Sequence, residues 1–296
     1  MKYVVTGSLG HISKPLAQQL IQAGHQVTII SSNADKTADI EKLGATAAIG
    51  SVDDTAFLTK TFTNADAVYT MVPPFFSNGG WLEHIVQVGK NYAEAIREAE
   101  VKYVVNLSSI GAHMPEGCGP VSGIYYVEQA LNELENVNVI HLRPGYFYYN
   151  FLNNAGMVKH LGIIGGNFGA DTQLALADTS DIAEAAAEEL LNLKFTGKSI
   201  RYVVSDERTT HEIAAVLGNA VGKPDLHWVD FSDEDTKAAM IQNGLPEEMA
   251  KHYTDMGAAL RSGEMAAEYQ QQKPITLSKT KLESFAPAFA QAYNNA

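Results

Sequence analysis

Short apolar segments alternate with amphipathic segments along the first half of the chain. The apolar runs lie at residues 2–6, 26–31, 45–50, 67–72, 102–108 and 137–142, and each ends at turn residues. The intervening segments repeat apolar positions at helical spacing, most clearly at 13–23, 35–43, 81–99 and 124–135. This alternation is typical of βαβ units. It predicts an α/β protein with a doubly wound parallel Rossmann sheet.

The pattern changes after residue 145. Residues 146–178 are rich in Gly, Asn and aromatic residues and predict loops with short elements. Beyond them we expect strands at 200–204 and 226–230, and helices from a cap at 179–181, from a capping box at Thr209, and from Ser232. We therefore predict a dinucleotide-binding domain at 1–150 and a smaller, mostly helical lobe at 151–296. Within the lobe, residues 179–204 are expected to pack back on the Rossmann sheet.

Composition narrows the classes of partner. The 21 Lys and Arg residues against 34 Asp and Glu give a formal charge of −13, and the basic residues are scattered. A broad nucleic-acid or membrane-surface site is therefore not expected. The single cysteine, Cys118, excludes an intrachain disulfide and a multi-thiolate zinc site. The nine histidines show no metal-ligand spacing, and the first residues contain no signal peptide, so we expect a cytoplasmic protein without a metal.

A glycine-containing turn joins the first predicted strand to the first helix. It has the sequence Thr-Gly-Ser-Leu-Gly-His-Ile-Ser at residues 6–13. Glycine permits the tight turn and a close approach of backbone to a diphosphate, and Ser13 stands where a third glycine is usual. The amides and dipole of a helix start attract the anion. We expect dinucleotide contacts at Gly7, Ser8, Leu9, Gly10, His11 and Ile12. The alternative is a merely tight turn.

The end of the second strand bears on the choice of coenzyme. An acidic residue there would bind the ribose 2′-hydroxyl of NAD(H), but the chain has Ser31, Ser32 and Asn33, with Lys36 one turn later. These residues favour NADP(H) over NAD(H), although the usual arginine is missing and a polar turn with a helix cap explains them equally well. Asp53 is expected to accept the adenine amino group or to cap a helix. Met71, Val72 and Pro73 are expected along the nicotinamide ribose.

With these motifs the chain resembles the NmrA-like branch of the atypical short-chain dehydrogenases. The resemblance covers nearly the whole chain and rests on residues 6–12, 107–109, 127–131 and 142–147, with 180–183, Thr209 and 222–224 similar to the small lobe of that family. It implies a Rossmann domain with the dinucleotide at the carboxyl ends of the strands. It also adds Ser108, Pro144, Gly145 and Tyr146 to the expected cofactor contacts.

The resemblance implies less about catalysis. Catalytic relatives carry a tyrosine and, four residues later, a lysine on the helix after the fifth strand. Here these positions correspond to Pro120 and Ile124, so both groups are absent. His113 and Tyr126 are the remaining candidates for a proton donor. The alternative is that the histidine is idle in its loop and the tyrosine packs in the core or a pocket wall.

Without this pair, the chemistry is limited to acceptors that need no enzyme acid. Quinones, azo dyes and cationic dyes take hydride to give a stabilised anion or a neutral product, so orientation suffices. Aromatic side chains that suit a flat ligand are expected to form the pocket, namely Phe75, Phe76, Trp81, Tyr125, Phe147 and Tyr148. The alternative is that they pack the interface between the lobes.

Three functions fit these observations. The first is an NADPH-dependent oxidoreductase acting on a flat conjugated acceptor such as a quinone or dye. The second is a non-catalytic NADP(H) or NAD(H) redox sensor that acts through a regulatory protein partner, which the missing tyrosine and lysine favour. The third is a reductase or isomerase of another small metabolite. The sequence leaves the physiological substrate and the oligomeric state open.

Overall fold

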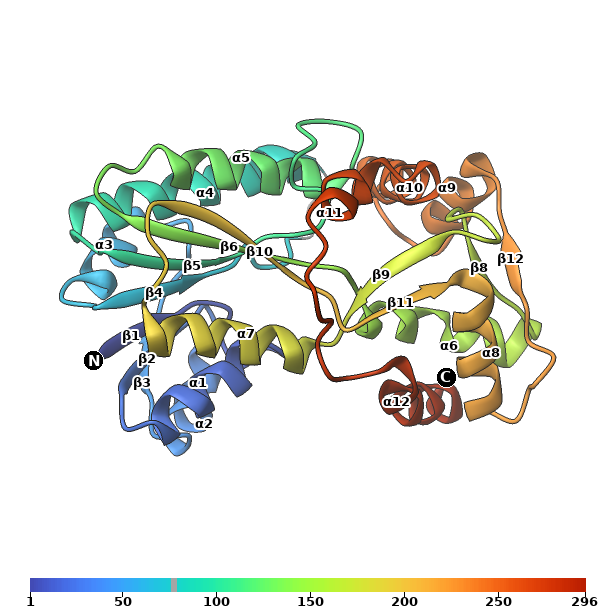
Figure 1. Cartoon of the computed structure of the whole chain (residues 1–296), viewed down its shortest axis with the longest axis horizontal. Coiled ribbons are helices and arrows are strands. Elements are labelled where there is room, and N and C mark those ends of the chain that lie inside the picture. The colour runs from blue at the N-terminus through green and yellow to red at the C-terminus, as the bar shows by residue number, and fades with distance from the viewer. Residues whose placement is uncertain (76–78) are drawn as a thin grey trace.

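A seven-stranded parallel sheet forms the first lobe of the computed structural model, which describes residues 1–75 and 79–296 (Figure 1). The strands follow the order β10-β6-β5-β4-β1-β2-β3. Their bounds are β1 (Lys2–Val5), β2 (Gln26–Ser31), β3 (Thr46–Ile49), β4 (Ala67–Thr70), β5 (Tyr103–Leu107), β6 (Asn138–Pro144) and β10 (Lys198–Val203). The predicted α/β Rossmann fold is confirmed.

Helices cover both faces of this sheet. The helices α1 (Ser13–Gln22), α2 (Thr37–Lys42) and α7 (Thr179–Asn192) share one core with it. The helices α3 (Thr55–Phe62), α4 (Trp81–Glu98) and α5 (Pro120–Asn132) share a second core on the opposite face. Although α7 and β10 follow residue 150, they belong to this lobe. The domain division at residue 150 stays a prediction.

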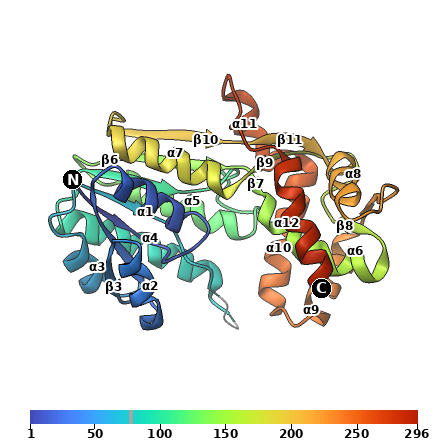
Figure 2. The same cartoon turned by 90° about the horizontal axis from the view of Figure 1, so that it is seen from below.

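The second lobe is smaller and mostly helical, and Figure 2 shows it beside the first. One short sheet contains three strands, β7 (Tyr146–Phe147), β9 (Gln173–Ala177) and β11 (Asp206–Thr209). A second contains two strands, β8 (Ile164–Gly166) and β12 (Trp228–Asp230). The helices are η2 (Tyr148–Asn154), α6 (Ala155–Leu161), α8 (Thr210–Ala220), α9 (Asp233–Gln242), α10 (Glu247–Ser262), η3 (Glu264–Ala266), α11 (Ala267–Gln271) and α12 (Leu282–Asn295). Apart from α9, each of these helices contributes residues to a third core.

An extended segment, residues 272–281, connects α11 to α12 across the junction of the lobes, and we call it the strap (Figure 1). Its Ser278 amide donates to the Val204 carbonyl at 2.8 Å. Thr280 donates through its hydroxyl to the buried Asp181 at 2.9 Å. These bonds fasten the strap to the end of β10 and the start of α7.

Several helix starts differ from the sequence-based expectation. The cap of α3 is Asp54, whose side chain accepts from the Phe57 amide, so Asp53 as a helix cap was wrong by one residue. Similarly, Asp178 caps α7 in place of residues 179–181. Helix α5 begins at Pro120 inside the expected loop, because proline suits a first helical position.

Two further helix starts in the small lobe agree more closely with the sequence. The capping box at Thr209 is confirmed, with Glu212 as its partner. Ser232 caps α9, as predicted. Asp233, the first residue of α9, accepts from Arg261 Nη1 at 2.9 Å.

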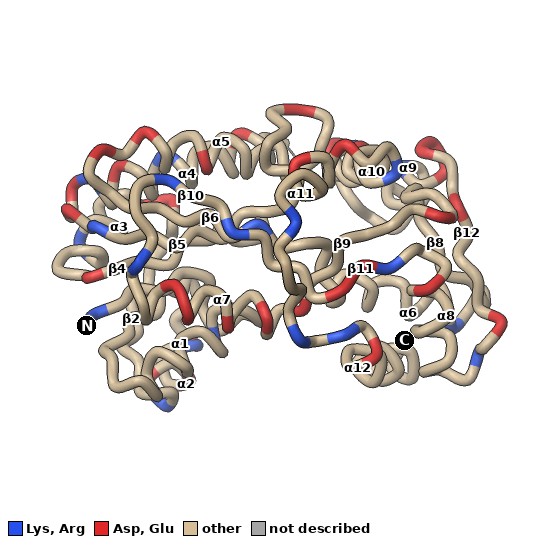
Figure 3. The backbone as a smooth tube through the Cα atoms, viewed as in Figure 1, with Lys and Arg blue, Asp and Glu red and all other residues tan. Residues whose placement is uncertain are grey.

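Several of the basic residues lie where the two lobes meet, around β10 and the strap, and the others are spread along the chain (Figure 3). Several at the junction are paired with carboxylates. Arg201 contacts Glu188 and Glu189, and Lys279 contacts Glu184. Ion pairs therefore neutralise these basic residues at the junction of the lobes. In residues 1–75 and 79–296, no helix is both long and apolar enough to cross a membrane.

Candidate active site at the strand ends

The loop between β1 and α1 has a shape that side chains would disrupt. Gly7 has a φ of +88°, and a Cβ added there would lie 2.5 Å from Ser13 Oγ. A Cβ on Gly10 would lie 3.0 Å from the Gly7 carbonyl oxygen. Ser8 also has a positive φ, 54°, and its amide donates to the Ile30 carbonyl at 3.0 Å. The loop is thus a cradle of backbone held against the end of β2.

The start of α1 is suited to an anion. Its cap residue, Ile12, is aliphatic and cannot accept a hydrogen bond from the amides of the first turn. That turn contains no carboxylate, so the dipole is not neutralised there. Ile12 lies in the core beside α1, and Leu9 packs against that core. These features fit the diphosphate of a dinucleotide.

His11 is an exposed residue of the same loop. Its ring lies 4.3 Å from the ring of Tyr149 on η2. Through this contact the small lobe touches the loop. The sequence pattern did not indicate Tyr149 as a site residue.

The polar residues after β2 are divided between internal and exposed positions. Ser31 is buried, and its hydroxyl accepts from Ser8 Oγ at 2.9 Å and from the Asn33 amide at 3.2 Å. The Asn33 side chain accepts from the Asp35 amide at 2.8 Å and caps the short helix η1 (Ala34–Lys36). Ser32 and Lys36 are exposed. The turn-and-cap interpretation therefore describes Ser31 and Asn33, and Ser32 and Lys36 are free to face a ligand.

Asp53 lies at the end of β3 beside α4. Its carboxylate accepts from Ser51 Oγ at 2.8 Å, and His84 Nδ1 lies 3.6 Å from it. The His84 ring stacks on Phe75 with 3.7 Å between ring centroids. The Asn91 side chain donates to the Asp53 carbonyl at 3.3 Å and fixes this loop. Phe76 lies outside the described residues.

The end of β4 lies directly against the loop. The Met71 amide donates to Thr6 Oγ1 at 2.9 Å, and Tyr92 donates to the Met71 carbonyl at 2.7 Å. Because the Met71 side chain lies 3.0 Å from the position of a Cβ on Gly7, the strand and loop are in close contact. Val72 and Pro73 follow and are half-buried.

A buried ion-pair network lies behind the ends of β5 and β6. The Ser108 hydroxyl donates to Glu128 on α5. Arg143 binds the same carboxylate through both Nε and Nη2, at 2.9 and 2.7 Å. It also donates to Glu268 of α11, which ties the small lobe to the sheet. Burial opposes the charge of Arg143, but its hydrogen bond to Glu128 raises its pKa, so it stays charged.

This network bears on two of the predicted residues. The Ser108 hydroxyl is engaged by Glu128. His113 Nδ1 is buried without a hydrogen-bond partner in the described part of the chain, and Glu268 Oε2 lies 3.9 Å away. The sequence-based reasoning did not pair Glu128 with Arg143, although both lie in the motifs that carried the family resemblance.

The backbone at Pro144 and Gly145 passes close to the small lobe. A Cβ on Gly145 would lie 2.4 Å from the Ala175 carbonyl oxygen. Tyr146 then packs its ring 5.3 Å from Phe151, and Phe147 is half-buried against the sheet core. Tyr148 instead turns into the core of the small lobe, where its hydroxyl donates to the Thr280 carbonyl at 3.0 Å. It is a core residue and is not part of the site proposed below.

Helix α10 packs against the starts of α4 and α5, a contact that the sequence did not reveal. Trp81, the first residue of α4, lies 5.5 Å from the His252 ring and 5.6 Å from the Tyr253 ring. Gly119, which caps α5, packs so closely on α10 that a Cβ there would lie 2.0 Å from the His252 carbonyl oxygen. The starts of α4 and α5 therefore both contact α10.

Tyr125 and Tyr126 lie on α5 with their rings 5.0 Å apart. Tyr125 is half-buried, whereas Tyr126 is 40% exposed. Neither lies among the ring contacts of Trp81 with α10. The structure thus joins Trp81 to α10 through ring contacts in which these two tyrosines take no part.

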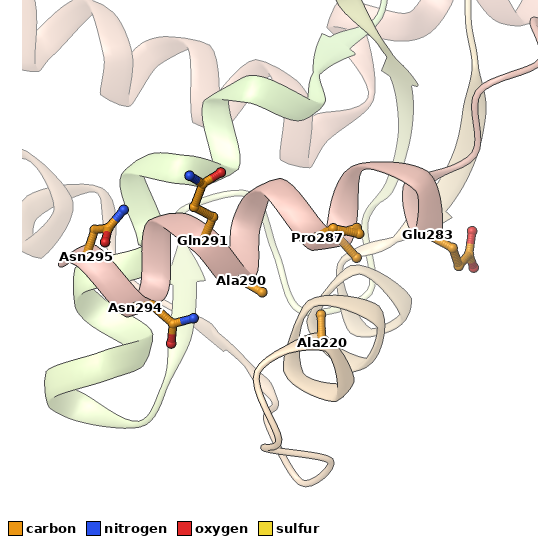
Figure 4. A pocket seen from close by; sticks show the side chains of 8 residues that line it. Ala220, Glu283, Pro287, Ala290, Gln291, Asn294 and Asn295 are labelled. Atoms are coloured by element: carbon orange, nitrogen blue, oxygen red, sulfur yellow. The ribbon is translucent and has the colours of Figure 1, made fainter.

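A hollow of about 710 Å³ lies between α8 and α12 of the small lobe, and Figure 4 shows the side chains that line it. Its lining consists of short and amide-bearing side chains with one carboxylate, namely Ala220, Glu283, Ala286, Pro287, Ala290, Gln291, Asn294 and Asn295. None of the predicted site residues lies in it. Within the described ranges, no group of three or more His, Cys, Asp or Glu residues is arranged to hold a metal ion.

A parallel sheet with a backbone cradle between its first strand and first helix defines a Rossmann-fold protein. The chain belongs to the NmrA-like family, which matches residues 2–286. An NAD(P)H azoreductase of Xenophilus azovorans is 22% identical over 294 residues, which is 99% of each chain.

Solved structures show the same fold. An NADPH-dependent quinone oxidoreductase from Escherichia coli, complexed with NADPH, gives a TM-score of 0.82 at 22% identity and covers 97% of this chain and 99% of its own. A triphenylmethane reductase from Citrobacter sp., complexed with NADP(H), gives 0.80 at 24% identity and covers 98% and 100%. The NmrA-like resemblance is confirmed.

Proposed function

We propose that this protein is an NAD(P)H-dependent oxidoreductase that transfers hydride to a flat conjugated acceptor such as a quinone or a dye. The observation that carries the proposal is the backbone cradle at Gly7 and Gly10, together with the aromatic wall that Trp81, at the start of α4, forms with Tyr253 of α10. The names of the relatives, an azoreductase, a quinone oxidoreductase and a triphenylmethane reductase, support the same chemistry.

A bound reduced nicotinamide supplies the hydride in this reaction. The amides at the start of α1 hold the diphosphate, and the dipole of the helix favours its negative charge. We expect Met71, just after β4, and Pro144, the last residue of β6, to border the nicotinamide from the two strands that flank β5. Aromatic side chains hold the acceptor flat, so catalysis depends mainly on proximity and orientation. Because Pro120 and Ile124 stand at the usual positions of the tyrosine and lysine, an acceptor that forms a stabilised product fits best.

We favour NADP(H) as the coenzyme. Ser32 and Lys36 are exposed just beyond β2, where they are free to meet a 2′-phosphate, and β2 ends without a carboxylate. Two relatives of known structure were solved with NADPH or NADP(H). Separate fluorescence titrations with NADPH and NADH test this preference, and equal affinities would overturn it.

The decisive experiment for the function is oxidation of NADPH, followed by its absorbance, with menadione or crystal violet as acceptor. We expect consumption with at least one of the two. The Gly10→Val variant is the control for contamination, since it removes the cradle and should lose the activity. Tight NADPH binding with no oxidation by either acceptor would contradict the proposal and favour a redox sensor.

A further inference from the structure

We propose that Tyr253 on α10 donates a hydrogen bond to the carbonyl oxygen of a quinone acceptor, with the Tyr146 phenol facing the same place from β7. This assignment rests on the proposed oxidoreductase function and adds to it the residue that recognises a carbonyl acceptor. It distinguishes quinones from cationic dyes, which present no such oxygen.

Helix α10 is well placed to carry such a residue, because it bridges the two lobes. Met249, near its start, is buried in the core shared with α4 and α5. Leu260, near its end, is buried in the core of the small lobe. Between them, the contact of Gly119 with the His252 carbonyl fixes the position of the helix along the start of α5. Tyr253 is thus held in place by packing on both sides.

The surroundings of Tyr253 leave its hydroxyl as a donor. The side chain is half-buried and its ring lies 5.6 Å from Trp81, at the start of the helix that follows β4. Burial raises the pKa of its phenol, so the proton is retained at neutral pH. A protonated phenol donates one hydrogen bond. The residue therefore combines an aromatic face for a flat ring with a donor for its oxygen.

Tyr146 approaches from the sheet side. It directly follows Gly145, at the end of β6, and its ring is supported by Phe151 at 5.3 Å and Phe168 at 5.5 Å. Burial raises the pKa of its phenol, the electrostatic influence of Tyr253 raises it further, and a hydrogen bond with Asn150 opposes the rise. That influence indicates that the two phenols, one on β7 and the other on α10, lie near each other. Their hydroxyl groups are polar groups among aromatic rings.

The chemistry explains why a donor at this point selects its acceptor. When a quinone takes a hydride, which carries two electrons and one proton, its oxygen gains negative charge and the coenzyme becomes oxidised. A proton from water completes the hydroquinone. A phenol that donates to the charged oxygen stabilises the transition state more than the ground state. A triarylmethane dye takes hydride at its central carbon and becomes neutral, so the phenol contributes nothing to that reaction.

The test compares Tyr253→Phe with the wild type on menadione and on crystal violet, with NADPH saturating. We expect kcat/KM for menadione to fall about ten-fold, mainly in kcat, because the lost bond forms with a charge that develops in the transition state. The value for crystal violet should stay within two-fold. The matched control is Tyr103→Phe, since Tyr103 lies at the opposite end of β5 and packs on Phe195. It should change neither value.

The outcomes separate this assignment from the function on which it rests. An equal loss with both acceptors would mean that Tyr253 acts only by packing, and an unchanged rate with menadione would mean that it contacts no oxygen. Either result overturns the assignment while leaving the oxidoreductase function intact. A wild type that oxidises NADPH with neither acceptor overturns the function itself, and the assignment with it.

Discussion

The two sides of the candidate site are built in different ways. The loop at residues 6–13 is shaped by its backbone, with positive φ angles at Gly7 and Ser8 and too little room for a side chain at Gly7 or Gly10. The aromatic wall consists of the rings of Trp81 and Tyr253, which helix packing brings together from distant parts of the chain. Substitutions in the loop should therefore abolish coenzyme binding, because its backbone shape leaves no room for other residues. Substitutions in the wall should instead change which acceptor is reduced.

The largest effect should follow from replacing Gly10 with valine. The added Cβ would lie 3.0 Å from the Gly7 carbonyl, and the branched side chain would fill the space expected for the diphosphate. We expect NADPH affinity to fall by at least about 100-fold, because the backbone can no longer approach the phosphates. Fluorescence titration measures the affinity, and circular dichroism checks that the fold is retained.

The control for this variant is Gly156→Val on α6, because an added Cβ there meets open space. It should bind NADPH like the wild type. If Gly10→Val bound as tightly as the wild type, the loop would not be the diphosphate site, and the contrast between the two sides would fail.

The second effect concerns the sheet beneath both sides of the site. Thr70 donates to Asn106 Oδ1 at 2.9 Å, so Asn106 Nδ2 faces His141 Nδ1, at 3.1 Å, as a donor. His141 then donates through Nε2 to Asn132 Oδ1 at 3.0 Å, which requires the neutral ring. Burial lowers the pKa of His141 from 6.5 to about 4. The unfolded chain therefore binds the extra proton first as the pH falls.

This shift fixes the sign of a pH effect on stability. Above pH 6.5 His141 is neutral in both states, and between 6.5 and about 4 only the unfolded state gains the proton. Stability should fall by about 3 kcal/mol through this window from His141 alone, at about 1.4 kcal/mol per unit of pKa shift. Urea denaturation of the wild type and of His141→Gln at each pH measures it. An equal pH dependence in the two proteins would contradict the assignment.

The third prediction separates the loop from the aromatic wall, because the substitution should disturb the wall alone. In Gly119→Ala the new Cβ would lie 2.0 Å from the His252 carbonyl at a φ of +55°, so α10 must move. We expect kcat/KM for menadione to fall about ten-fold, since small misplacement of a substrate-positioning element is costly. NADPH affinity should stay within two-fold. Gly156→Ala is the matched control, and a parallel loss of NADPH affinity would show that the two sides are not independent.

The smallest effect tests the coenzyme preference. Ser32→Arg adds a guanidinium beside the exposed Lys36, where we place the 2′-phosphate. NADPH affinity should rise about five-fold relative to NADH, which is roughly the value of one exposed ion pair. Thr63→Arg, at the end of α3, adds the same charge elsewhere and should leave the ratio unchanged. An unchanged ratio in Ser32→Arg would mean that residue 32 does not face the phosphate.

The sequence predicted most clearly what local rules determine. The strand, loop and helix at residues 2–22 follow from an apolar run, two glycines and a helical repeat that are adjacent in the chain. Helix α3 escaped the pattern because three threonines and two phenylalanines among its eight residues favour strands. The cap at Asp54 and the burial of Leu58 and Phe62 stabilise it nevertheless.

What the sequence could not predict depends on contacts between distant residues. No local motif brings Tyr253 to Trp81 or Glu268 to Arg143, because these pairs form only when α10 and α11 fold over the strand ends. The aromatic residues at 146–148 are adjacent in the sequence, yet Tyr146 is half-buried at the edge of the small-lobe core, against Phe168, whereas Tyr148 is buried inside that core. Their residue type predicted that all of them line a pocket. Only the packing of the folded chain shows which of them are core residues instead.

A crystal structure grown with saturating NADPH tests the central claim most directly. We predict that the diphosphate lies on the amides at the start of α1, with the nicotinamide between Met71 and Pro144 and its exposed face towards Tyr253. A diphosphate bound away from residues 7–13, or a cradle filled by the side chains of the protein itself, would contradict the account.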